Sequence, residues 1–210
     1  MHEIKNDAFF DFIKQYDDDN EYHFVGEIDY HLLSADKPYK GLSSHREALL
    51  KVFESLFEKS LENKESAAKA YGSAVSNKLT PLAYDIDKAR AVPLDPEAFF
   101  YCPNIVKTDY YGNASYDSEW RPNDDNLGTS VPHWYALMEP IHARRNKPED
   151  FKRVNEALYP EGTDALDVYE WTTDWSDLFD DGHEWYGACC WSVYDKRMKR
   201  YVVMLVSSTD

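Results

Sequence analysis

Four ionisable residues alternate along a short stretch near the start of the chain. His23, Glu27, Asp29 and His31 share one parity of residues 22–32, and apolar residues hold the other parity. On a β-strand the four would line one face, with residues two apart separated by about 7 Å. Two imidazoles and two carboxylates placed in this way could hold a metal ion or act as an acid–base pair. We favour an ordinary solvated strand face instead, because charged groups are exposed by default.

A second group lies in the stretch WTTDWSDLFDDGHEWYGACCW, which spans Trp171–Trp191. As a loop before a buried strand, residues 180–184 could present carboxylates and His183 together, as in a metal or general-acid site. We favour a hydrated turn, in which Asp and Gly suit the backbone conformation. Cys189 and Cys190 would point to opposite faces of a strand, so we expect at least one in the core and no redox pair.

The charge distribution is more informative than either group. Between Val154 and Asp195 the chain has 11 carboxylates and no Lys or Arg. This window supplies −11 of the net charge of −16, while the remaining residues hold 28 acids and 23 bases. Like charges repel one another and oppose compact folding, so a use for them is worth considering. Acidic groups steer basic partners toward a surface, and Trp and Tyr rings are favoured interface anchors.

These patterns predict a surface that combines acids with aromatic rings and binds a basic protein. Its expected members are Trp171, Asp174, Trp175, Asp177, Asp180, Asp181 and Glu184. The favoured function is a cytoplasmic binding or inhibitor protein that covers a basic site on its partner. The analogy with bacterial immunity proteins, which neutralise nuclease toxins, is one of charge logic only. An aromatic core with acids on its solvated side is an equally good interpretation of the segment.

Two other classes of function stay open. A small hydrolase or metal-dependent enzyme could use the cluster at residues 23–31, completed by His183 or Glu184. A carbohydrate or small-ligand binder could stack its ligand on Trp171, Trp175 or Trp185. The chain has no Gly-rich phosphate loop, G-x-S-x-G elbow, H-E-x-x-H or C-x-x-C motif. We therefore assign no catalytic residue or metal ligand, predict no cofactor, and lean against an enzyme.

The totals limit the partners and the compartment. At 43% hydrophobic residues, the 210-residue chain can form a core. The net charge of −16 argues against nucleic acid or an anionic membrane as a partner, because phosphates are bound by Lys and Arg. The uncharged run at residues 185–194 is far shorter than the roughly 20 residues of a membrane helix, and no secretory signal is recognisable. Three Cys, two of them adjacent, suit a reducing cytoplasm. The oligomeric state stays open.

Periodicity predicts one α+β domain over residues 1–210, with a loop-rich middle at 76–130. Strands are expected at about 22–32, 166–171, 184–194 and 201–207, in a mostly antiparallel sheet. The last two are apolar on both parities, which indicates central strands covered on both faces. Helices are expected at about 7–16, 44–61 and 148–159. Ser44 and Glu47 have capping-box spacing, and the second helix either breaks near Asn63 or continues toward Val75.

Overall fold

A five-stranded antiparallel sheet organises the computed structural model, which describes residues 1–19, 28–100, 106–108, 114–116, 133–138, 148–184 and 188–207. Its order is β1-β7-β6-β5-β2. The strands are β1 (Ile28–Ser34), β2 (Ala91–Leu94), β5 (Leu166–Trp171), β6 (Ala188–Asp195) and β7 (Arg200–Ser207). A separate two-stranded sheet pairs β3 (Val106–Thr108) with β4 (Ala114–Tyr116). The expected antiparallel sheet and the α+β class are confirmed.

The helices lie close to their expected positions. The α-helices are α1 (Ala8–Asp19), α2 (Leu42–Tyr71), α3 (Ser73–Ser76), α4 (Pro96–Phe100), α5 (His133–Met138) and α6 (Pro148–Leu158). Two 3₁₀ helices, η1 (Asp177–Phe179) and η2 (Asp181–Glu184), follow β5. The segment at 76–130, expected to be mostly loop, contains β2, α4, β3 and β4 among its described residues. No helix among the described residues is long and apolar enough to cross a membrane.

Both faces of the sheet are covered, as the apolar parities of the last two strands predict. One face packs against α1, α4, α5 and α6, and it includes Cys189, Trp191 and Met204. The other face packs against the first turns of α2, and it includes Cys190 and Leu205. The adjacent cysteines are free, buried and on opposite faces, as side-chain alternation on a strand requires.

The start of α2 differs from the expected capping box. The helix begins at Leu42, and its N-cap is Gly41, which has a φ of 62° and makes no side-chain cap. Ser44 lies inside the first turn, where its Oγ accepts a hydrogen bond from the Lys40 amide at 2.9 Å. Glu47 pairs with Lys37 at 2.6 Å instead of reaching back to a capping residue. The capping-box prediction was wrong, because the helix begins at Leu42 and its N-cap is Gly41 and not Ser44.

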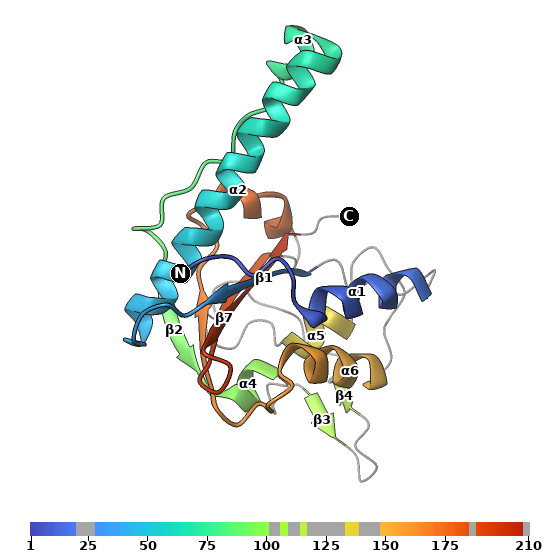
Figure 1. Ribbon diagram of the computed structural model, residues 1–210, viewed down its shortest axis with the longest axis vertical. Coiled ribbons are helices and arrows are strands. Elements are labelled where there is room, and N and C mark those ends of the chain that lie inside the picture. The colour runs from blue at the N-terminus through green and yellow to red at the C-terminus, as the bar shows by residue number, and fades with distance from the viewer. Residues whose placement is uncertain are drawn as a thin grey trace.

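The far end of α2 extends well beyond the sheet. The helix is continuous to Tyr71 and ends at Gly72, whose φ of 83° favours glycine and whose amide donates to the Ala68 carbonyl at 3.0 Å. No break occurs near Asn63. The buried residues of α2 all lie at or before Phe53. Residues 58–82, which we call the arm, comprise the outer half of α2, α3 and the returning chain, and they project from the body in Figure 1.

A buried arginine joins three elements on the other side of the sheet. Arg200, at the start of β7, is 3% exposed and pairs with Asp7 at 2.7 Å. Asp7 also accepts a hydrogen bond from the Phe9 amide at 2.9 Å, next to the start of α1. A second guanidinium nitrogen of Arg200 donates to the Leu158 carbonyl at the end of α6. This one side chain therefore fixes α1 and α6 relative to the sheet.

The Arg200→Met variant is expected to lower the free energy of unfolding by about 3 kcal/mol, because it leaves a largely buried carboxylate without its cation. Urea unfolding at pH 7 measures the loss. Arg197→Met, in the β6–β7 turn just before Arg200, is the matched control. Its ion pair with Asp164 is exposed, so we expect a change of about 0–1 kcal/mol. Equal losses in the two variants would contradict the role given to Arg200.

Candidate functional site

The strand-face cluster is only partly described. His23 and Glu27 lie outside the described residues, and the strand is described from Ile28 onward. Asp29 is exposed, whereas the His31 side chain is 15% exposed and lies 3.5 Å from a Glu3 carboxylate oxygen. Burial lowers the pKa of His31, and the hydrogen bond with Glu3 opposes that shift. No group of three potential metal ligands is found among the described residues.

The aromatic members of the expected binding surface are internal. Trp171 and Trp175 are 1% and 3% exposed, and they pack in the core beneath α2. Trp175 lies 4.4 Å from the Phe53 ring, centroid to centroid. Neither ring can stack on a ligand or contact a partner in this conformation, which corrects the expectation that they form part of a surface. Trp185 lies outside the described residues.

Three acids of the lysine-free window lie around the β6–β7 turn. Asp164 pairs with Arg197 at 2.7 Å, and Asp167 pairs with Lys196 at 2.6 Å. The fully buried Asp195 accepts backbone hydrogen bonds within the same turn. These acids meet the bases of the β6–β7 turn, which begin one residue after the window ends. They are therefore not available as a steering surface.

Four acids at the other end of β5 differ from these. Asp174, Asp177, Asp180 and Asp181, which we call the acidic patch, are all exposed. None of them forms an ion pair within the part of the chain that the structure describes. The side chain of Glu184, the remaining acid expected here, is outside the description. The patch is thus a local excess of negative charge within eight consecutive residues.

The acidic patch is held on a fixed backbone. The Ser176 hydroxyl caps η1 by accepting from the Leu178 amide at 3.2 Å. The Asp177 amide donates to the Ala83 carbonyl at 3.1 Å, and the Asp177 carboxylate accepts from the Ala83 amide at 2.9 Å. Beneath the patch, Phe179 is fully buried against α2. Asp177 therefore has a structural part as well as a charge.

A buried hydrogen-bond chain lies close to the base of α2. His45 and Ser192 are both 0% exposed, and the His45 Nδ1 lies 2.8 Å from the Ser192 hydroxyl. The Trp171 indole N–H donates to the same hydroxyl at 2.8 Å. On the other side of the ring, the His45 Nε2 lies 3.0 Å from the Tyr39 hydroxyl. The Tyr39 hydroxyl is in turn hydrogen-bonded to Asp167.

The network assigns the proton of His45. The Tyr39 hydroxyl donates its hydrogen bond to the Asp167 carboxylate, so its oxygen is free to accept from His45 Nε2–H, and in that tautomer the bare Nδ1 accepts from the Ser192 hydroxyl. Burial lowers the pKa of His45 to about 4, so the ring is neutral at pH 7. Since the Ser192 hydroxyl is inaccessible, this chain satisfies buried polar groups and presents no nucleophile to a substrate.

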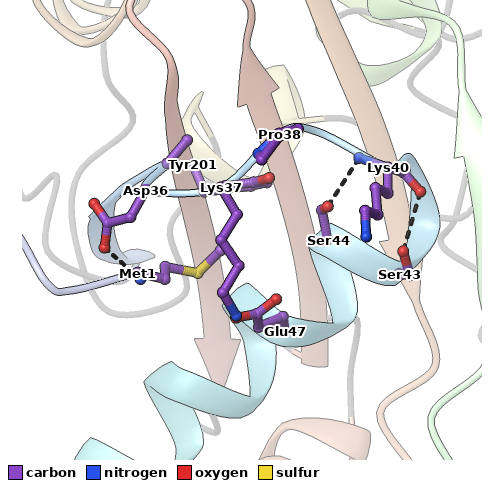
Figure 2. A pocket seen from close by; sticks show the side chains of 10 residues that line it. Met1, Asp36, Lys37, Pro38, Lys40, Ser43, Ser44, Glu47 and Tyr201 are labelled. Atoms are coloured by element: carbon purple, nitrogen blue, oxygen red, sulfur yellow. Dashed lines mark hydrogen bonds and ion pairs between the residues drawn. The ribbon is translucent and has the colours of Figure 1, made fainter.

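One small cavity of about 220 Å³ lies between the β1–α2 connection and the first turn of α2 (Figure 2). Lys37 and Glu47 bridge it through their ion pair. Asp36 pairs with the N-terminal ammonium, and that bond together with the Ser34 hydroxyl lowers the pKa of Asp36 to about 2. Most of the charges around this cavity are therefore already paired with one another, and they identify no ligand.

The chain matches no family model, no curated protein and no solved structure. Its function is therefore argued from its own residues.

Sequence reasoning missed His45 and Ser192, although a signal for each was present. His45 precedes Leu49 and Val52 by four and seven residues, which places it on the buried stripe of α2. Ser192 lies on the parity of Cys190 and Tyr194, both of which face α2.

Acidification tests the buried state of His45. Its folded pKa of about 4 is below its ordinary value of 6.5, so the stabilisation is present above pH 6.5 and is lost as the pH falls toward 4. Between pH 7 and pH 5 we expect His45 to account for about 2 kcal/mol of lost unfolding free energy. Urea unfolding of His45→Gln should show a correspondingly shallower pH dependence. The exposed His183→Gln control should follow the wild type, and a wild-type slope in His45→Gln would contradict the assignment.

Proposed function

We propose that this protein binds a basic partner protein through the acidic patch. The observation that carries the proposal is the contrast between the two ends of β5. At one end Asp164 and Asp167 are matched by bases of the β6–β7 turn, and at the other end four exposed carboxylates have no matching base among the described residues. Uncompensated charge repels itself, and a basic partner would relieve that repulsion.

The fixed backbone of the patch supports a binding role. The hydrogen bonds to Ala83 and the buried Phe179 hold the patch, so little conformational freedom is lost on association. Trp171 and Trp175 contribute from below as core residues and not as contact residues. An inhibitor that covers a basic site on another protein is one form of such binding, by charge logic only.

The two alternatives have less support. For an enzyme, Asp29 and His31 would need further groups, and no metal-binding trio is found among the described residues. For a ligand binder that stacks its ligand on tryptophan, the two described candidates, Trp171 and Trp175, are buried. Neither alternative is favoured by a specific contact of the described residues.

The test neutralises the patch without removing its structural contact. In the triple variant D174N/D180N/D181N, Asp177 is kept because it holds Ala83. The control D11N/E156Q/E161Q removes three exposed carboxylates elsewhere. Partners are captured from cell extract with a carbodiimide, which joins carboxylates directly to lysines, and are identified by mass spectrometry. Binding of the identified partner is then titrated at low and high salt.

We expect the patch variant to bind roughly ten-fold more weakly, at about 0.5 kcal/mol for each lost charge, while the control binds as the wild type does. The difference should shrink at high salt, because exposed charges are screened. A salt-insensitive partner, or equal binding by the two variants, would refute the proposal.

A further inference from the structure

Apart from Leu82, which packs against the core beneath α2, the arm lies away from the body of the chain. Four of its apolar side chains are exposed: Leu61 at 37%, Tyr71 at 75%, Val75 at 43% and Leu79 at 42%. Only two other large apolar side chains among the described residues are exposed to a similar degree. Figure 1 shows α2 and α3 rising away from the sheet and the remaining helices. Four exposed apolar side chains on one projection are candidates for contact with another molecule.

Side-chain hydrogen bonds hold the arm to itself at two points. The Ser76 hydroxyl donates to the Lys64 carbonyl at 3.1 Å, and the Leu82 amide donates to the Ser60 hydroxyl at 3.1 Å. The outer half of α2 extends from a packed inner half and needs no separate nucleation, but its apolar side chains Leu61 and Tyr71 gain no burial there. Tyr71 ends α2, Val75 lies in α3 and Leu79 follows α3. Covering these three side chains would bury them, as the sheet buries the inner part of α2.

Charge indicates the chemistry of the occupant. In a chain of net charge −16, residues 66–84 contain Lys69 and Lys78 and no acid. The end of the arm is therefore apolar and locally basic, which suits an acidic surface. The acidic patch is such a surface, and it adjoins the base of the arm because Asp177 is bonded to Ala83.

We infer that two copies of the chain pair their arms antiparallel about a two-fold axis. The end of each arm, with Lys69, Tyr71, Val75, Lys78 and Leu79, then rests on the acidic patch of the other copy. The two contacts are equivalent and close on themselves, as in the commonest homodimers. Along the helix, the base of the arm at Ser60 and its end at Tyr71 are about 16 Å apart. Because this distance is the same in both copies, both contacts form together. The inference rests on the proposed function, since it names a second copy as an occupant of the same patch.

The test exchanges charges between the two halves of the contact. One full-length variant, K69E/K78E, has an acidic arm, and the other, D174K/D180K/D181K, has a basic patch. Analytical ultracentrifugation gives the mass of wild type, of each variant alone and of an equimolar mixture. We expect a wild-type dimer, two monomeric variants and a dimer in the mixture, where each arm again meets a patch of opposite charge. Circular dichroism verifies that both variants are folded.

The apolar part of the contact has its own variant. Y71S/V75S/L79S should weaken the dimer at least ten-fold, whereas T80A on the exposed returning chain should not. A wild-type chain that stays monomeric to about 100 µM overturns the inference, since a weaker pairing would not be specific. A mixture of the two variants that stays monomeric also overturns the inference. So does a full-length chain that sediments with phosphatidylglycerol vesicles through its arm instead of forming a dimer.

The two proposals fail separately. If wild type is a monomer but its capture of a basic protein still depends on the patch, only the dimer is refuted. If the wild type is a dimer, D174K/D180K/D181K is a monomer and no basic protein is captured, the patch serves self-association alone and the proposed function is refuted. If D174K/D180K/D181K changes neither mass nor capture, both proposals are overturned.

Discussion

The burial of β6 and β7 on both faces is the constraint on which the rest of the structure depends. Two adjacent strands that are apolar on both parities cannot lie against water on either side, so the chain must supply a layer for each face. The inner part of α2 supplies one layer, and α1, α4, α5 and α6 supply the other. Polar groups caught between the layers must then find partners inside, which is why Arg200 reaches both Asp7 and the end of α6.

The same constraint shapes the acidic segment that follows β5. Trp171 must cover the sheet beneath α2, and its indole N–H finds the Ser192 hydroxyl there. Trp175 and Phe179 follow it into the same core, and Asp174 and Asp177 between these rings are turned outward. Acidic side chains, like other polar side chains, tolerate those solvent-exposed positions. The alternation of aromatic and acidic residues is therefore first a consequence of packing, and any binding role builds on a backbone that packing has already placed.

Much of the fold could be predicted from periodicity, and much of the site could not. Strand alternation placed Cys189 and Cys190 on opposite faces, and helical periodicity found the inner part of α2. The lysine-free window predicted a single acidic surface because charge was counted along the sequence and not in space. Lys196 and Arg197 lie just past its end, and they pair across space with Asp167 and Asp164. Whether an acid is paired, or a Trp is exposed, depends on tertiary contacts that no local pattern contains.

The length of α2 poses a different problem from its position. Covering the sheet requires the helix only as far as Phe53, yet it continues for 18 more residues, none of them buried. Elongation from the packed inner half can extend α2 without a new nucleus, but it gives no reason for a large apolar side chain, Tyr71, at the exposed end. Packing that the described part of the chain does not provide would explain it. Since the end of the arm is basic and the same molecule displays an unpaired acidic surface at the base of the arm, a second copy offers that packing without requiring any other protein.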